Sequence, residues 1–178
     1  MEATKSDNPS GHEEGNECQY LTFIMAEEEY GVDILTVQEI RGWESATKIP
    51  NAPEFIKGVI NLRGTIVPIM DLRLRFGLEE VAYSPTTVVI ILKVNSDSKE
   101  RVVGIVVDAV SDVYTVADTD IRKPPELNDD DDGSIRGLVS VNDRTVILMN
   151  VDTLLSMGAT LNLNLAAMAK DSPKEGEL

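Results

Sequence analysis

The sequence predicts an all-β protein made of two small five-stranded barrels with a few short helices. Short apolar runs rich in valine and isoleucine recur along the chain, and they are too short for typical helices. β-branched side chains are stiff at χ1 and suit a pleated surface, so these runs are expected to be strands. A weak internal repeat then divides the folded region into two halves of roughly 65 residues.

The clearest strands are expected at YLTFIM (residues 20–25), TTVVIILKV (86–94) and VVGIVVDAV (102–110), each read as one strand. Reversals are expected at AEEEYG, at NSDSKE and at VNDRT, where polar turn residues follow apolar runs. These signals place hairpins in both halves of the chain.

Two segments carry more specific expectations. VQEIRG (residues 37–42) follows a strand with Val37 and Ile40 at helical spacing, so both are candidate core positions. Pro68, inside TIVPIM, has no backbone N–H to donate, which predicts an edge strand or a bulge at that point.

The repeat aligns YGVDILTVQEI (residues 30–40) with VGIVVDAVSDV (103–113). Its matched positions are Gly31 and Gly104, Val37 and Val110, Glu39 and Asp112, and Ile40 and Val113. Downstream, GVI with TIVPIM is echoed by GLV with TVILM, and the halves close on LRLRFG and DTLLSMG. Because a small barrel buries little surface alone, the two barrels are expected to pack face to face. They would share a core and leave a groove at their junction.

The predicted organisation has a folded domain between two polar ends. The boundaries are a disordered acidic leader at 1–17, a domain at 18–158 with repeat halves at about 20–80 and 86–158, and a tail at 159–178. Within the tail, LNLNLAAMAK can form a modest helix, and NDDDDG (128–133) is expected to be a solvated loop.

Composition excludes several functional classes. The 178 residues carry a net charge of −15, and the one His and one Cys both lie in the leader or at its end. A metal site of Cys and His needs about four ligands, and a Ser–His or Cys–His nucleophile needs a histidine in the core. An acidic surface repels phosphate backbones, so nucleic acid is a poor partner, and an oligonucleotide-binding barrel would need basic and aromatic positions. No apolar run approaches the about 18 residues of a membrane span, and the first residues lack the features of a signal peptide. A cytoplasmic binding protein is expected.

Three carboxylates leave a second class open. Asp33, Asp71 and Asp108 each lie at the edge of an apolar strand and could serve a small acid–base enzyme or a ligand-binding barrel. The favoured interpretation is that each satisfies backbone donors at a strand end or turn. No glycine-rich phosphate-binding motif is present in the sequence.

Arg63 stands out among the charged residues. NLRG reads as a turn between two strands, which lifts Arg63 onto a hairpin tip. It is either an ordinary surface arginine or an anchor for a protein partner, because arginine is enriched at such contacts. Glu39 beside Arg41 is expected to form a solvated pair of little energetic weight.

Three long motifs carry a family resemblance: EEYGVDILTVQEIRG, PEFIKGVINLRGTIVPIMDLR and RVVGIVVDAVSDV. They resemble the CheW-like domain family of bacterial chemotaxis, and the match runs from about residue 19 to residue 157. Because no receiver or kinase segment is attached, the chain is similar to the stand-alone adaptors of that family. The resemblance implies two intertwined SH3-like five-stranded barrels.

The resemblance also implies a function. Such proteins have no catalytic activity, metal or cofactor, and they join the cytoplasmic tips of chemoreceptors to the regulatory domain of the histidine kinase CheA. They help to build arrays, in rings that can include further copies, so the protein is expected in the cytoplasm and recruited to membrane-associated receptor arrays. It is not expected to insert into the membrane itself. An alternative within the family is a coupling protein of a non-flagellar chemosensory pathway.

The motifs assign residues to these contacts by resemblance. Val37, Glu39 and Gly58 match the kinase contact, and Arg63 and Gly64 match the region that couples receptor and kinase. The receptor-facing groove is matched by Val89, Gly104, Val110 and Val113.

Overall fold

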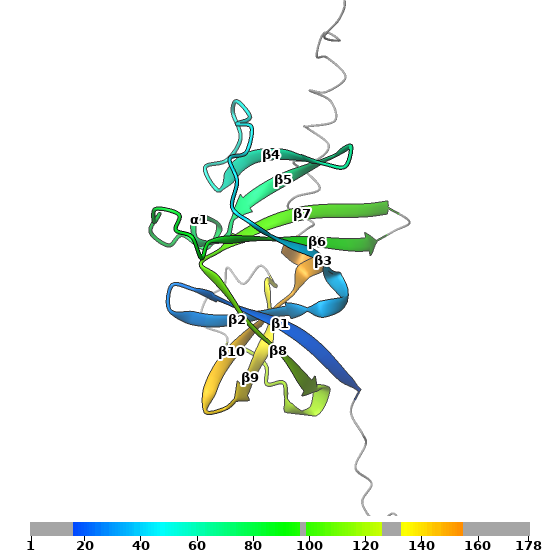
Figure 1. Ribbon diagram of the computed structural model, residues 1–178. Helices are drawn as coiled ribbons and strands as arrows, with labels where there is room; N and C mark the ends of the chain where they lie inside the picture. The colour runs from blue at the N-terminus through cyan, green and yellow to red at the C-terminus, as the bar shows by residue number, and fades with distance from the viewer. Residues whose placement is uncertain (1–15, 97–98, 126–132, 155–178) are drawn as a thin grey trace, which may run out of the picture.

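The computed structural model describes residues 16–96, 99–125 and 133–154. Within these ranges, ten strands form two five-stranded sheets (Figure 1). The first sheet, here barrel A, has the order β8 (Ala109–Ala117), β1 (Glu17–Met25), β2 (Glu28–Asp33), β10 (Arg144–Met149), β9 (Ile135–Val141). The second, barrel B, has the order β3 (Val37–Gly42), β6 (Val88–Ser96), β7 (Lys99–Val107), β5 (Thr65–Asp71), β4 (Ile56–Leu62). The all-β prediction is confirmed. Residues 1–15 of the predicted leader, the whole of the predicted tail at 159–178 and all but the last residue of the NDDDDG loop lie outside the described residues. Glu17, placed at the end of the leader, is instead the first residue of β1.

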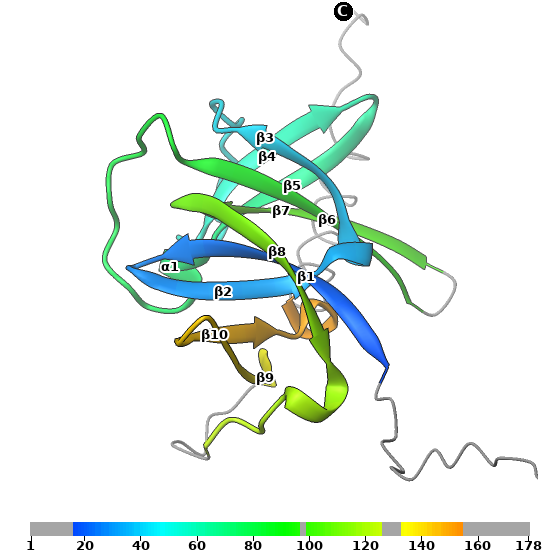
Figure 2. The same cartoon turned by 60° about the horizontal axis from the view of Figure 1, so that its bottom comes forward.

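The two barrels are intertwined. Barrel A takes the first two strands of the first repeat half and the last three of the second, and barrel B takes the complementary set. Figure 2 shows the chain passing from β2 into β3, and from β7 into β8, as it changes barrel. The repeat halves therefore do not each form a sheet of their own.

The repeat is a structural pseudo-symmetry. Moving five strands along the chain converts the order of barrel A into the order of barrel B. Each barrel contains one parallel pair, β10 with β2 and β5 with β7. Isolated bridges join Thr47 to Val59 and Arg122 to Leu138, at matching places beside β4 and β9. Both bridges bring the segment after one edge strand against the opposite edge strand, as barrel closure requires.

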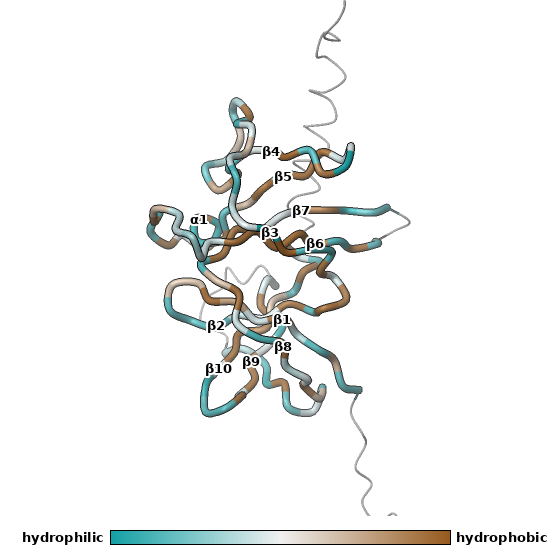
Figure 3. The backbone as a smooth tube through the Cα atoms, in the orientation of Figure 1, coloured by the Kyte–Doolittle hydropathy of each residue, from teal (hydrophilic) through white to brown (hydrophobic). Residues whose placement is uncertain are grey.

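The core has three parts. One cluster fills barrel B and one fills barrel A, around Val89 and Tyr20 respectively. The largest cluster lies between the barrels and takes residues from both, including Phe23 and Ile105. The shared core that the sequence predicted is therefore present. Strand β6 lies between two of these clusters, with Ile90 in the shared core, so its apolar run is continuous rather than alternating (Figure 3).

Short helices occur at the connections. They include η1 (Ile34–Thr36), α1 (Leu72–Arg75) and η2 (Asp118–Asp120), and residues 151–154 after β10 are also helical. The LRLRFG stretch forms α1, whose N-cap Asp71 accepts hydrogen bonds from the N–H groups of Arg73 and Leu74. No helix within the described residues is long and apolar enough to cross a membrane.

The run at residues 102–110 is not one strand, as was expected. It divides at Asp108 into the end of β7 and the start of β8. The Asp108 N–H donates to the carbonyl oxygen of Ile24 at 3.0 Å, and its carboxylate binds Arg73. These contacts with distant parts of the chain turn the backbone into the other barrel.

The helical spacing of Val37 and Ile40 was also misleading. Residues 37–42 form strand β3, in which partly buried and exposed residues alternate. Val37 is partly buried against the shared core, whereas Ile40 is 44% exposed. The strand period therefore overrides the helical one, and Ile40 is not a core residue.

Pro68 lies in a strand that is not at the edge of its sheet. β5 lies between β7 and β4, but its parallel pairing with β7 covers only Ile69 to Asp71. Pro68 pairs with Val59 of β4 alone, so the missing N–H meets no ladder on the other side. The edge-strand alternative was wrong for β5 as a whole. The bulge alternative is closer, because the β4–β5 register shifts between Ile56 and Gly58, directly beside the Val59–Pro68 pair.

Candidate functional site

A chain of alternating charges crosses the outside of barrel B. Arg63, at the β4–β5 turn, donates from Nη1 to Oε2 of Glu39 on β3 at 2.9 Å. Arg41 places Nε 3.7 Å from Oε1 of Glu39 and Nη2 3.7 Å from Oε2 of Glu44. The Arg63 side chain is 74% exposed and that of Glu39 only 22%. The Arg63 guanidinium is therefore accessible to a partner, while its hydrogen bond to Glu39 fixes its position.

The turn that carries Arg63 has a defined geometry. Arg63 and Gly64 have φ values of 51° and 90°, and the Gly64 N–H donates to Oδ1 of Asn61 at 2.7 Å. Two consecutive positive φ values are typical of the tight hairpin turns that match strand twist. No atom lies within 4 Å of where a Cβ at Gly64 would be, so the requirement for glycine there is conformational.

Gly58, on strand β4 of barrel B, is required by the backbone packing beneath the surface that carries Arg63. Its φ is +140°, and a Cβ at this position would overlap the carbonyl oxygen of Thr47. That oxygen accepts the Val59 N–H at 2.9 Å, in the bridge that closes barrel B. Gly58 is therefore needed for the close approach of two backbones, and it presents no side chain to a partner.

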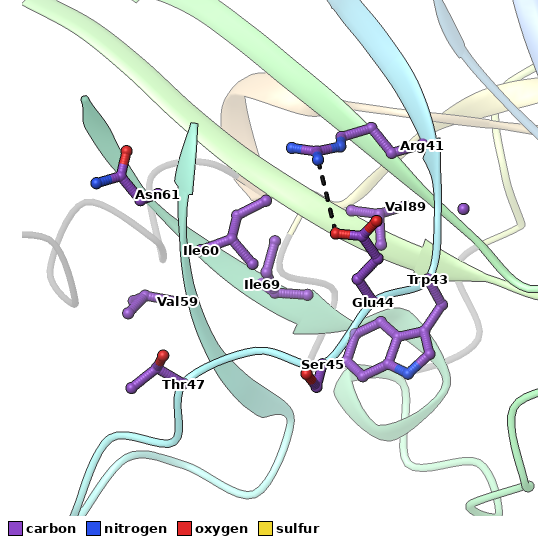
Figure 4. Close-up of a pocket in the computed structure, with 11 residues that line it drawn as sticks. Arg41, Trp43, Glu44, Ser45, Thr47, Val59, Ile60, Asn61, Ile69 and Val89 are labelled. Atoms are coloured by element: carbon purple, nitrogen blue, oxygen red, sulfur yellow. Dashed lines mark ion pairs between the residues drawn. The ribbon is translucent and has the colours of Figure 1, made fainter. Parts of the chain in front are cut away.

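A cavity of about 230 Å³ opens beside the charge chain. Its lining includes Trp43, Val59, Ile69 and Val89 as apolar residues and Arg41, Glu44, Ser45 and Asn61 as polar ones (Figure 4). The Trp43 ring packs against the Tyr83 ring, with the two ring centroids 4.4 Å apart. The cavity is thus a partly apolar hollow with charged and amide groups around it.

The structure gathers some of the residues assigned by resemblance and separates others. Glu39, Gly58, Arg63 and Gly64 all lie on β3, β4 or the β4–β5 turn of barrel B. Val37 lies at the start of β3, on the side of the shared core.

The four residues assigned to a receptor groove fall into two groups. Val89 is 4% exposed inside barrel B, and a Cβ on Gly104 would lie 2.6 Å from Cδ1 of Ile69 in the same interior. Val110 and Val113 lie on β8 of barrel A, where Val110 packs on the shared core and Val113 is 43% exposed.

Neither of two pockets found in the described residues crosses the junction where a groove was expected. The cavity near Arg41 is lined from barrel B alone. A second pocket is lined from barrel A alone, by Ile24, Glu27, Glu28, Glu29, Arg144 and Thr145.

The three aspartates considered for catalysis have structural partners. Asp33 accepts the Leu35 N–H at 2.9 Å, and Asp71 caps α1 and accepts the Tyr83 hydroxyl at 2.7 Å. Burial raises the pKa of that phenol, and its hydrogen bond to Asp71 adds to the effect. Asp108 accepts from Arg73 and from the Ala26 N–H, and the hydrogen bond from Arg73 lowers its pKa. Each carboxylate satisfies backbone donors, which is the interpretation that the sequence favoured.

Sequence reasoning missed the pocket and the main partner of Glu39. Trp43 is the only tryptophan of a chain with few aromatic residues, and it directly follows VQEIRG. In the sequence, this single tryptophan was the one indication of a pocket. The contact between Arg63 and Glu39 spans 24 residues, so no local pattern could indicate it.

Comparisons with known proteins agree with one another. The family model for the CheW-like domain matches residues 19–159. The chain is 48% identical over 139 residues to chemotaxis protein CheW of Klebsiella aerogenes, covering 78% of this chain and 81% of that protein. It is 38% identical over 148 residues to chemotaxis protein CheW of Rhizobium meliloti, covering 83% and 93%. The crystal structure of scaffolding protein TtCheW from Thermoanaerobacter tengcongensis superposes with a TM-score of 0.68 at 36% identity, covering 76% of this chain and 90% of that one.

Proposed function

Because the chain belongs to the CheW-like domain family, we propose that it is a non-enzymatic adaptor of bacterial chemotaxis. It would couple the cytoplasmic tips of chemoreceptors to the histidine kinase CheA and act in the cytoplasm, at receptor arrays. The family match spans nearly the whole described domain, and the matched relatives carry chemotaxis and scaffolding names.

The observation that carries the kinase side of the proposal is the charge chain on barrel B. Arg63 offers an exposed guanidinium on a rigid turn, and Glu39 fixes its position. A pre-positioned arginine suits the bidentate recognition of a carboxylate on a partner protein. We assign Val37, Glu39 and Gly58 to the kinase contact and Arg63 and Gly64 to the coupling region, with Gly58 acting through the backbone.

The receptor side is assigned to β8 of barrel A. This strand is at the edge of its sheet, and Val113 is exposed on it while Val110 is anchored in the shared core. Receptor tips are helical, and an apolar strand face beside a packed core can receive the apolar face of a helix. Val89 and Gly104 would support this function from within barrel B, by fixing the packing against which the surface strands rest.

The two surfaces lie on different barrels of one rigidly packed chain, which suits an adaptor. Contacts between unlike surfaces generate rings or extended arrays instead of closed dimers, so further copies of the chain can join them. Coupling requires that the receptor state change the free energy of kinase binding.

Reconstituted kinase activity tests the proposal. Receptor-containing vesicles and CheA are assayed for autophosphorylation with and without this protein, and attractant is then added. We expect activation and attractant control only when the protein is present. Receptor control of the kinase at the same level without the protein would refute the coupling role.

A further inference from the structure

Two hairpin turns lie side by side at one end of barrel A. Strands β2 and β10 are parallel neighbours, so the turn before each of them lies at the same end of the sheet (Figure 2). Both turns have two consecutive residues with positive φ, at positions 26–27 and 142–143, as in tight hairpins. A pocket of about 460 Å³ is lined by residues of both hairpins, namely Ile24, Glu27, Glu28, Glu29, Arg144 and Thr145.

Glu29 is a buried carboxylate on the wall of this pocket. The residue is 5% exposed, and Oε1 of its side chain is buried with no hydrogen-bond partner among the described residues. Its strand β2 lies in the middle of the sheet, where Glu29 pairs with Ile24 of β1 and with Val146 of β10. Burying a carboxylate that has no hydrogen-bond donor destabilises the folded state. The pocket therefore lacks a donor for this oxygen.

The fold does not require a carboxylate at this position. The repeat matches Gly31 with Gly104, so Glu29, two residues earlier, corresponds to Val102. Val102 is partly buried and packs against the interior cluster of barrel B. Barrel B thus has an apolar side chain where barrel A has an unpaired carboxylate. Because the same fold accepts a valine there, packing alone does not explain the glutamate.

We propose that this pocket binds a primary ammonium group, which donates a hydrogen bond to the Glu29 carboxylate. An ammonium has a positive charge and three N–H donors, and it has no acceptor that would need a donor in return. Glu28 and Thr145 also line the pocket and can accept the remaining N–H groups, while Ile24 can contact the alkyl chain that carries the ammonium. A metal ion is not the inferred occupant, because no group of three or more His, Cys, Asp or Glu within the described ranges is placed to hold one. The inference does not depend on the proposed function.

Arg144 is the alternative partner for Glu29 within the chain. It lines the same pocket, but it is exposed and leaves Oε1 of Glu29 without a hydrogen bond. We expect Arg144→Ala to leave the urea midpoint unchanged and to strengthen ammonium binding slightly, because one repelling charge is removed. A clear fall of the midpoint, together with no saturable ammonium binding by wild type, would show that Arg144 fills this role and would overturn the inference.

Titration of the protein alone tests the site directly. n-Butylammonium chloride is added at constant ionic strength while the backbone amide signals of Glu29 and Thr145 are followed by NMR. Tetramethylammonium chloride serves as a cation of equal charge without N–H donors. We expect saturable shifts with n-butylammonium, with a dissociation constant in the millimolar range, and only small linear shifts with tetramethylammonium. Equal responses to the two cations would overturn the inference.

A pair of variants assigns the binding to Glu29. Glu29→Gln removes the buried charge with little change of shape, and Glu54→Gln removes an exposed carboxylate outside the pocket, so both change the net charge equally. We expect Glu29→Gln to weaken n-butylammonium binding at least tenfold, while Glu54→Gln stays within about twofold of wild type. The urea midpoint of Glu29→Gln should be at or above that of wild type, because an unpaired buried charge is removed. Wild-type affinity in a folded Glu29→Gln variant would overturn the inference.

The same variants show where the ammonium group comes from. Both are compared with wild type in binding to the CheA regulatory domain and to receptor-containing vesicles. Weaker binding of one partner by Glu29→Gln alone identifies the ammonium as a lysine side chain of that partner. Unchanged binding of both partners, with saturable n-butylammonium binding by wild type, identifies it as a free amine. If Glu29→Gln does not fold, as judged by circular dichroism, the two titrations of wild-type protein decide the question alone.

Discussion

Replacing Asp108 with alanine would loosen the contact that ties the two barrels together. Asp108 lies where the chain leaves β7 of barrel B for β8 of barrel A. Arg73, at the α1 helix beside β5, donates to its carboxylate from Nε at 2.9 Å and from Nη2 at 2.7 Å. The Ala26 N–H, in the β1–β2 turn of barrel A, donates to the same carboxylate at 3.0 Å. One side chain thus joins three segments from both barrels.

The expected cost follows from this geometry. Hydrogen bonds to charged groups contribute about 1.5–3 kcal/mol, and the bidentate form is the strong one. The Arg73 and Asp108 side chains are 17% and 29% exposed, so water replaces part of the loss. We expect Asp108→Ala to lower the free energy of unfolding by about 2–3 kcal/mol. For a chain of this length, that corresponds to a fall in Tm of roughly 4–12 °C.

Urea unfolding followed by circular dichroism and Trp43 fluorescence measures this change. The matched control is Asp118→Ala, which removes an exposed pair with Arg136 at 3.7 Å and should cost less than about 0.5 kcal/mol. A double-mutant cycle with Arg73→Ala should give a coupling free energy of about 1–2 kcal/mol. Additive effects of the two substitutions, or an Asp108→Ala cost as small as the control, would show that the contact does not join the barrels energetically.

The pH dependence gives an independent check of the same contact. The hydrogen bond from Arg73 lowers the pKa of Asp108 below its usual 3.8. A group with a lowered folded-state pKa adds stability above its unfolded pKa and loses it as the pH falls through the folded value. The difference between wild type and Asp108→Ala should therefore be complete at pH 7 and shrink below about pH 4.

Three further predictions concern backbone geometry and the charge chain. Gly58→Ala, at φ +140° and against a backbone carbonyl, should cost about 3 kcal/mol or more, whereas Gly42→Ala, with open space around its Cβ, should change the urea midpoint little. Ala26 and Glu27 have φ values of 52° and 68°, so replacing them with Asn and Gly should raise the free energy of unfolding by about 1 kcal/mol, measured by thermal melts. Arg63→Ala should leave stability within about 0.5 kcal/mol of wild type and weaken CheA binding at least fivefold in calorimetry; unchanged binding would remove Arg63 from the interface.

The strands and the repeat could be predicted because both depend on residue types within short stretches of the sequence. Runs of β-branched residues indicate strands, and matched glycines at Gly31 and Gly104 indicate duplicated hairpins. The exchange of strands between barrels could not be derived from the same pattern, because the repeat shows which segments are alike and not which ones pair. The division of residues 102–110 depends on Arg73, 35 positions away from Asp108, and the residue types within the run do not reveal it.

The candidate site, like the fold, could be predicted only in part from the sequence. NLRG indicated a hairpin tip, and Arg63 does lie at a tight turn with Gly64. Its pairing with Glu39 depends on closure of barrel B, which brings opposite edges of one sheet together. The cavity is lined by residues from separate stretches of barrel B, among them Trp43, Asn61 and Val89, so no local pattern could indicate it.

The differences between the two pseudo-symmetric halves would allow one fold to serve the two partners of the proposed function. At the second crossover between barrels, Asp108 is fixed by Arg73, while its counterpart in the first crossover, Leu35, is 87% exposed. In the interiors, Tyr20 packs in barrel A at the place where barrel B has Val89. A symmetric pair of barrels would present the same surface twice and could not distinguish the two proposed partners. Because the strands are exchanged, the shared core takes side chains from both barrels, so a substitution there is expected to affect both surfaces.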